Sequence, residues 1–189
     1  MKIEECKERL NNVGAWIGSA DNKISIGLGI FSITGLFVGF IFSENFNNLM
    51  HLKATNFNSF ISVLVIFSLS LLLFAFALCF YVYGIIPRFN SAKDFKKRAG
   101  KRSKESYTNF WFYKHIASFS SSDEFTEECK TKFGEIDAEC MQILEEVYAN
   151  SKICLKKMNC FRVGIVLSLL SVLTSLICVL NLIIACVIK

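Results

Sequence analysis

The sequence predicts an all-α integral membrane protein with three transmembrane helices and a helical cytoplasmic module between the second and the third. Hydrophobic residues make up 53% of its 189 residues, which is more than an ordinary soluble domain carries. Three stretches, 24–42, 59–86 and 163–188, contain no charged side chain. The first is about as long as the ~20 residues that a helix needs to cross a bilayer, and the other two exceed that length, so they can span with tilt or project past the membrane face. A segment in lipid must satisfy its own backbone hydrogen bonds, so all three are expected to be helices.

Residues 1–23 are expected to form a cytoplasmic helix that leads into the first span. They carry charges of both signs, namely Glu4, Glu5, Glu8 and Asp21 against Lys2, Lys7, Arg9 and Lys23. A cleaved signal peptide is the alternative. The apolar run is longer than the usual ~7–15 residues of a signal peptide, and no A-x-A site follows it, so an uncleaved span is favoured.

Basic residues predict the orientation of the spans. The segment 87–162 contains Arg88, Lys93, Lys96, Lys97, Arg98, Lys101, Arg102, Lys104, Lys114, Lys130, Lys132, Lys152, Lys156, Lys157 and Arg162, whereas the loop 43–58 contains only Lys53. The positive-inside rule places the N-terminus and 87–162 in the cytoplasm, and the loop 43–58 and Lys189 outside. The net charge of +5 is therefore interpreted as a topology signal, and no nucleic-acid partner is expected.

The eight cysteines are scattered and form no C-x-x-C pair. Cys6, Cys129, Cys140, Cys154 and Cys160 fall in or beside the segments expected in the cytoplasm; Cys79, Cys178 and Cys186 fall in the spans. With only two histidines in the chain, neither a metal site nor a disulfide framework is expected.

Two segments of the cytoplasmic module could bind a ligand. Residues 92–104 are strongly basic, which suits topology and attraction to anionic lipid, or alternatively the binding of a ligand phosphate. Residues 107–119 are rich in aromatic side chains, among them Trp111 and Tyr113, with His115 beside them. Such a cluster suits interfacial anchoring, or the stacking of a base.

The rest of the module has a helical pattern. Ser121 and Glu124 form a capping box that predicts a helix start, and Gly134 is expected to interrupt that helix. A seam then recurs at steps of three and four, and it consists of Ile136, Cys140, Ile143, Val147, Asn150, Cys154 and Met158. It continues into the third span without a helix breaker, which predicts one long helix. Asn150 is the polar residue on the seam, where such a residue can fix register or oligomer state.

Small residues form two patterns within the spans. One is Gly35-x-x-x-Gly39, and the other is the stripe Gly164, Ser168, Ser171, Ser175 and Cys178. Both favour close helix packing, with hydroxyls bonded to backbone carbonyls; the alternative is a weakly polar wall that lines a pore after assembly. The spans hold no acidic or basic residue, which argues against a proton-coupled pump.

Catalysis is not expected. The sequence has no glycine loop that could cradle a phosphate, no nucleophile elbow and no paired histidines at ligand spacing. An enzyme is therefore disfavoured, and no cofactor is expected.

Several motifs together carry a resemblance to a known family. They are Asp21 and Lys23 before the first span, Pro87-Arg88 after the second, Phe112-Tyr113-Lys114-His115-Ile116-Ala117, and Asn150-Ser151-x-Ile153-x-x-x-Lys157 before the last. In kind and order the chain resembles the transmembrane effectors of Pycsar, the pyrimidine cyclase system of bacterial antiphage defence. The resemblance covers nearly the whole chain.

The resemblance implies an effector in the bacterial inner membrane that responds to cyclic CMP or cyclic UMP. A partner pyrimidine nucleotide cyclase would make this ligand during infection, and the effector would then impair the membrane, as a homo-oligomer in the bilayer, before phage can spread. Candidate residues for ligand binding or coupling are Asp21, Lys23, Trp111, Tyr113, His115, Asn150 and Lys157. Two alternatives remain: a related effector that answers a cyclic oligonucleotide, and a structural membrane protein that is not gated.

Asp21 and Lys23 are charged residues directly before the first apolar run, and each is expected to meet a group from elsewhere in the chain. They are two residues apart, so on one helix they point to different sides and are poor partners for each other. Asp21 is expected to meet Lys157 or Arg162 at the cytoplasmic foot of the bundle. Such a pair would couple the module to the first span.

Overall fold

The computed structural model describes residues 2–86 and 109–187, and within these ranges it contains six helices and no strand. The predicted all-α class is confirmed for this part of the chain. The basic segment 92–104, the Pro87-Arg88 pair, Tyr107 and Lys189 lie outside the described residues.

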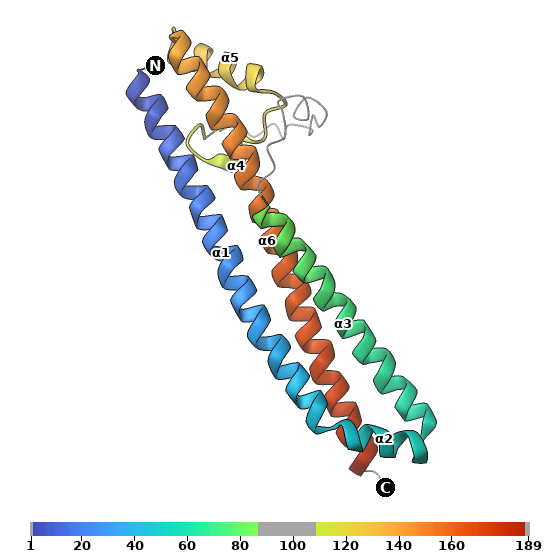
Figure 1. The fold of residues 1–189 in the computed structure, drawn as a ribbon. Helices are drawn as coiled ribbons and strands as arrows, with labels where there is room; N and C mark the ends of the chain where they lie inside the picture. Colours follow the sequence, from blue (N-terminus) through green and yellow to red (C-terminus); the bar gives the residue numbers. More distant parts are fainter. Residues whose placement is uncertain (1, 87–108, 188–189) are drawn as a thin grey trace. The chain divides into compact units, whose positions relative to one another are not determined.

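Three of the helices are long enough and apolar enough to cross a membrane (Figure 1). They are α1 (Ile3–Glu44), α3 (Phe57–Ile85) and α6 (Ala138–Val187). The predicted span 24–42 falls within α1, the span 59–86 lies within α3 except for its last residue, and the described part of 163–188 falls within α6. Helix α6 runs unbroken for 50 residues, so the prediction of one long helix that joins the seam to the third span is confirmed.

The chain divides into two compact units. The first, called the module here, consists of Met1–Asn22 and Gly84–Asn159; the second, the membrane unit, consists of Lys23–Tyr83 and Cys160–Lys189. Helices α1 and α6 each contribute one part to the module and the other part to the membrane unit. The N-terminal segment therefore belongs to the same core as the residues that follow α3.

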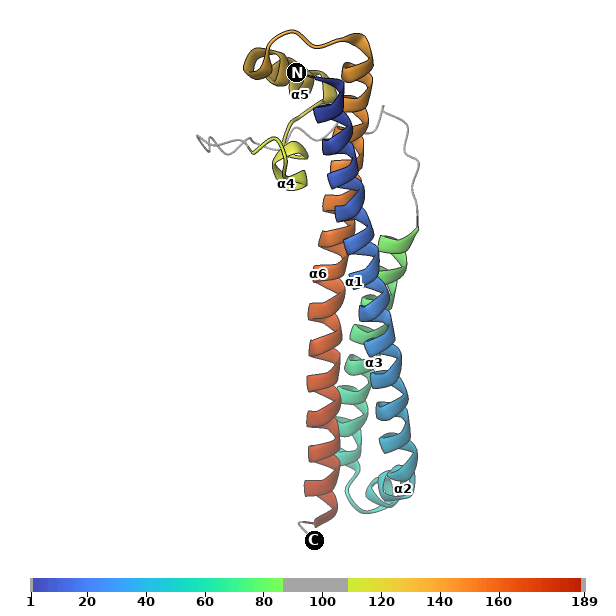
Figure 2. The same cartoon turned by 90° about the vertical axis from the view of Figure 1, so that its left-hand side faces the viewer.

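The membrane unit is built from α3 and the apolar parts of α1 and α6, which lie side by side in both views (Figure 2). Aromatic stacking joins α1 to α3, with ring centroids 3.7 Å apart for Phe31 and Phe74 and 4.0 Å apart for Phe42 and Phe67. The outward faces carry exposed apolar side chains such as Leu36. This is the surface that contact with lipid requires.

The connection 43–58, expected to be a loop, contains the helix α2 (Phe46–Thr55). Leu49 and Leu52, three residues apart, are buried against Val63, Cys178 and Leu182. The burial of these two leucines on one helical face stabilises a helix here, although the asparagine-rich composition suggested a loop.

The module core gathers side chains from α1, α6 and two shorter helices, α4 (Tyr113–Ile116) and α5 (Ser122–Phe133). It contains Cys6, Val13, Phe110, Ile116, Phe119, Phe125, Cys129, Cys140, Leu144, Val147 and Tyr148. Aromatic rings make up much of it, so the predicted aromatic cluster is largely a packing element.

The local signals around α5 are confirmed. The Ser121 hydroxyl accepts the Glu124 backbone N–H at 3.1 Å, as in a capping box, and the Glu124 carboxylate accepts the Ser120 backbone N–H at 2.8 Å. Gly134 ends the helix with φ +82°, a conformation that favours glycine.

The buried seam of α6 differs from the predicted one in two positions. The structure buries Leu144 and Ser151, whereas Asn150 is half-buried. Both registers share Cys140, Val147 and Cys154, and only the packing of α1 and the aromatic core selects between them. The polar residue at the centre of the seam is therefore Ser151, whose Oγ is buried and has no hydrogen-bond partner among the described residues.

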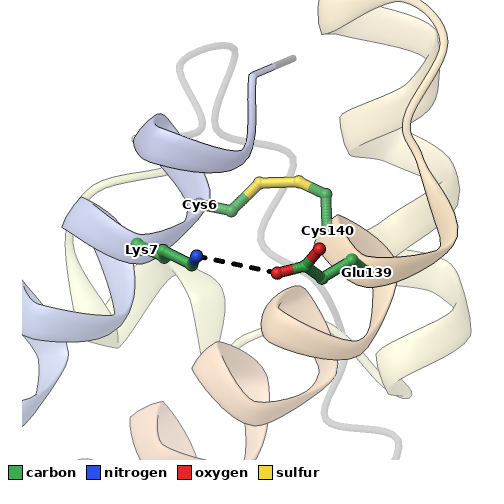
Figure 3. Close-up of polar contacts among 4 residues, drawn as sticks. All are labelled: Cys6, Lys7, Glu139 and Cys140. Carbon is green, nitrogen blue, oxygen red and sulfur yellow. Dashed lines mark ion pairs between the residues drawn. A yellow bond between two sulfur atoms is a disulfide. The ribbon is translucent and has the colours of Figure 1, made fainter.

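Cys6 of α1 and Cys140 of α6 form a disulfide, and an ion pair of 3.6 Å between Lys7 and Glu139 lies beside it (Figure 3). The expectation that the cysteines form no disulfide is wrong for this pair. Their Cα atoms lie 6.0 Å apart although 134 residues separate them in sequence. Cysteine spacing could not reveal a contact that depends on how two long helices pack.

Candidate ligand-binding site

Arg9 is the most unusual residue of the module because it is charged and only 2% exposed. It follows the buried Cys6 by three positions and precedes the buried Val13 by four. Arg9 therefore lies on the face of α1 that packs into the core.

The Arg9 guanidinium lies over two aromatic rings. Its central carbon is 4.7 Å from the centroid of the Trp111 ring and 4.6 Å from that of Phe133, the last residue of α5. The Trp111 backbone N–H donates to the Asn109 side-chain oxygen at 2.9 Å, which fixes the turn that carries the indole. Trp111 is 40% exposed, so part of its side chain faces solvent while the rest covers the guanidinium.

Two nitrogen atoms of Arg9 make no hydrogen bond with the described residues. Nε and Nη1 are buried and have no hydrogen-bond partner among residues 2–86 and 109–187. Burial lowers the pKa of the guanidinium, and the nearby Cys129, Glu5 and Glu8 oppose that shift. An arginine stays charged even so, so these donors belong to a buried cation.

Cys129 does not neutralise this charge. Burial raises the pKa of its thiol to about 11, although Arg9 acts in the opposite direction. At neutral pH the group is therefore a thiol and not a thiolate. The site consists of a cation, two aromatic faces and a neutral thiol, a set that can accept an anion and has no nucleophile activated by a base.

Lys152 provides a contrast within the same module. Its ammonium donates to the Phe119 carbonyl at 3.2 Å and lies 5.2 Å from the Tyr148 ring centroid. Burial lowers the pKa of Lys152, but the group has an acceptor. Arg9 also lies beside aromatic rings, but its Nε and Nη1 have no hydrogen-bond acceptor among the described residues.

Asp21 and Lys157 form an ion pair, with 2.5 Å between Oδ1 and Nζ. This is one of the two partners that the sequence suggested for Asp21. The pair joins α1 to α6 close to the ends of the module segments, Asn22 and Asn159. Because Asp21 is 44% exposed, solvent screens the attraction, and about 1 kcal/mol or less is expected from it. Lys23, two residues on, is exposed.

Tyr113 and His115, two further candidate ligand-binding residues of the module, make contacts within the protein. Tyr113 is buried, with its ring 5.6 Å from Trp16 and 4.8 Å from Phe112. His115 is half-buried, and its Nδ1 accepts the Asn109 backbone N–H at 3.3 Å. Of the three aromatic candidates, Trp111 has the most exposed side chain.

Two of the predicted glycines in the spans adjoin aromatic rings of α3. A Cβ at Gly35 would lie 2.6 Å from the Phe74 ring, and one at Gly164 would lie 2.9 Å from Tyr81. Gly39 has open space around it among the described residues.

The serine stripe of α6 faces α3. Ser70 and Ser171 bond reciprocally, each hydroxyl donating to the other's carbonyl at 3.0 Å. The Ser70 and Ser175 hydroxyls are 2.5 Å apart, and the Ser168 hydroxyl donates to the Gly164 carbonyl at 2.8 Å. A pore lined by this stripe stays a prediction, and it would require α3 to move away from α6.

Sequence reasoning missed Arg9 as a site residue and Tyr81 as a packing residue. Arg9 could have been recognised as a single charged residue on an otherwise apolar stripe of the helix. Because Lys7 and Glu8 directly precede it, the segment was interpreted as an ordinary charged one. For Tyr81, no sequence pattern indicates that Gly27 and Gly164 meet the same ring.

Comparison with known proteins agrees with the resemblance found in the sequence. The family described as the Pycsar effector protein domain matches residues 5–185. No curated protein and no solved structure matches the chain. Together with its three membrane-spanning helices, this match shows that the chain belongs to the Pycsar effector family, the membrane effectors of an antiphage defence system.

Proposed function

We propose that this effector responds to cyclic CMP or cyclic UMP through its module and then impairs the bacterial inner membrane as a homo-oligomer. One observation carries the proposal: α1 and α6 each pass from the module into the membrane unit as a continuous helix. A ligand that changes how these helices pack in the module therefore acts on the helices that form two of the three spans.

The ligand is a cyclic pyrimidine nucleotide in this proposal. A pyrimidine nucleotide cyclase supplies it, in keeping with the family to which the chain belongs. Such a molecule offers one phosphate charge and one base face. A charge-assisted hydrogen bond contributes roughly 1.5–3 kcal/mol and base stacking ~1–3 kcal/mol, while micromolar affinity needs about 8 kcal/mol. The protein must therefore make several contacts with the nucleotide.

The oligomer follows from the energetics of the switch. A ligand drives assembly only if the assembled state binds it more tightly than the resting state. A nucleotide shared between subunits meets that condition. Gly39 supports close approach of a second copy, because the space around it is open and small residues let transmembrane helices pack closely.

The ion pair of Asp21 and Lys157 is the proposed coupling element. It holds α1 and α6 together within the module, near the residues at which both helices continue into the membrane unit. Loss of the pair should weaken the response without preventing insertion. In this scheme the N-terminus and the module lie in the cytoplasm, where the cyclase product is made.

Coexpression tests the proposal in cells. The effector is produced with an active pyrimidine nucleotide cyclase or with a catalytically inactive version, and uptake of propidium and growth are measured. We expect uptake and growth arrest only with the active enzyme. Equal uptake in both strains, at equal membrane levels of effector, would show a membrane protein without gating. A third strain produces a cyclic oligonucleotide synthase in place of the cyclase, and uptake in that strain alone would show a different messenger.

A further inference from the structure

We propose that Arg9 is the residue that binds the phosphodiester of the activating nucleotide, and that the Trp111 indole covers Arg9 while the ligand is absent. This inference deepens the proposed function and rests on it. No motif in the sequence indicates that Arg9 binds a phosphodiester.

The first argument is the unused hydrogen-bonding capacity. Nε and Nη1 of Arg9 are buried without a partner among residues 2–86 and 109–187. Buried polar groups are nearly always hydrogen-bonded, so each exception needs an explanation. The half-buried Lys152 follows the rule, because the Phe119 carbonyl accepts from it.

The second argument is geometric. The central carbon of the guanidinium lies over the Trp111 ring and over the Phe133 ring, 4.7 and 4.6 Å from their centroids. An aromatic ring face offers no oxygen acceptor, so these two contacts leave Nε and Nη1 without a hydrogen-bond partner among the described residues. A phosphodiester with two free oxygens can accept two such N–H bonds side by side, a geometry that arginine offers and lysine does not.

The third argument is charge. The groups that act on Arg9 electrostatically are Cys129, Glu5 and Glu8. The two glutamates are exposed and therefore solvated, and Cys129 is a neutral thiol because burial raises its pKa. The buried cation lacks a close counter-charge among the described residues, and a monoanion would supply it.

Access depends on Trp111. It is the exposed member of the pair of rings, and a single turn through Asn109 holds it. If the indole rotates away from Arg9, it uncovers the guanidinium and presents a face on which a pyrimidine can stack. Binding is therefore expected to change the surroundings of the indole.

The chain allows this change to be observed, because its two tryptophans are Trp16 and Trp111. In a Trp16→Phe background the full-length protein in liposomes emits from Trp111 alone. Emission is titrated with cyclic CMP, cyclic UMP, cytidine and uridine. Vesicles of neutral lipid and vesicles with phosphatidylglycerol are compared, because that headgroup is also a phosphodiester.

We expect cyclic CMP or cyclic UMP to shift the emission in neutral vesicles, and the uncharged nucleosides to do so far more weakly. Arg9→Met should weaken nucleotide binding by about 10- to 150-fold, the range for one charge-assisted hydrogen bond. Arg9→Lys should recover only part of it, because the charge remains but the fork is lost. Lys152→Met is the matched control, and it should bind normally.

A stability measurement distinguishes this role from simple packing. Methionine fits between aromatic rings and carries no buried charge, so Arg9→Met should unfold at the same temperature as the parent or higher. Nucleotide affinity within twofold of the parent in Arg9→Met would overturn the inference. So would a loss of affinity that merely follows a loss of thermal stability.

The outcomes also separate the inference from the proposed function. If nucleotides make parent and Arg9→Met liposomes leak alike, the effector is gated but Arg9 is not its phosphate ligand. If no nucleotide changes emission or leakage in the parent, both proposals fail. A shift caused only by phosphatidylglycerol would assign Arg9 to a lipid headgroup and contradict the nucleotide.

Discussion

Replacing Gly164 with alanine tests how closely the helices of the membrane unit are packed. The Tyr81 ring of α3 lies between Gly164 of α6 and Gly27 of α1, and a Cβ at either glycine would be 2.9 Å from the same ring carbon. Tyr81 is only 1% exposed, and its hydroxyl is 3.4 Å from that of Ser168. The ring cannot retreat from one helix without moving into the other.

The expected cost has two parts. Overpacking of this kind costs roughly 1–3 kcal/mol, and exchange of glycine for alanine in a helix returns about 1 kcal/mol of propensity. Gly164→Ala should therefore destabilise the protein by about 0–2 kcal/mol. Gly39→Ala is the matched control: it gains the same propensity and meets nothing within 4 Å. The two variants should differ by about 1–3 kcal/mol.

Unfolding by dodecyl sulfate in mixed micelles measures this difference. Adding Tyr81→Leu should remove most of it, because the ring that meets the new methyl is gone and the two sites are coupled only through it. Equal stability of Gly164→Ala and Gly39→Ala would refute the packing described for this ring.

Four further predictions concern the module and the topology. Asp21→Asn should leave membrane levels unchanged but reduce propidium uptake on activation; lower levels with a proportionate loss of uptake would make Asp21 a folding residue instead. Ser151→Ala should raise stability by roughly 1 kcal/mol in a denaturation series, because it removes a buried hydroxyl without a partner among the described residues, and a loss of stability would imply that the hydroxyl is bonded. Asn150 is only half-buried, so part of it remains free to contact a second copy; Asn150→Leu should keep or raise stability while it alters oligomer size in crosslinking or the response to ligand, and unchanged crosslinking and toxicity would remove its assembly role. Reporter fusions at Gly100 and Lys189 should be active inside and outside the cytoplasm respectively; the reverse at both sites would invert the topology.

The sequence was informative where one local pattern decides the structure. The three charge-free runs give three spans, because the hydrocarbon core demands a helix of that length. The capping box at Ser121 and the glycine at Gly134 give the bounds of α5, because each acts on its own turn of backbone. The sequence limited the partner of Asp21 to Lys157 or Arg162, because these cations come just before the third span, and the structure shows the pair with Lys157.

Features that depend on which helix faces meet could not be predicted from the sequence. A shift of one position exchanges Asn150 for Ser151 at the centre of the seam, and the spacing of apolar residues permits both. The meeting of Cys6 with Cys140 and the burial of Arg9 both follow from the packing of α1 against distant segments. The candidate site was therefore predicted only through Trp111, the aromatic half of it.

The most direct test of the account is leakage from liposomes that contain the purified protein. The vesicles are loaded with a self-quenching dye, and the inserted fraction is verified by protease accessibility. Cyclic CMP, cyclic UMP, cyclic AMP and cyclic GMP are then added separately. The account predicts dye release with cyclic CMP or cyclic UMP, and little or none with the two purine nucleotides. Release that is identical with every nucleotide and without any, from correctly inserted protein, would contradict it.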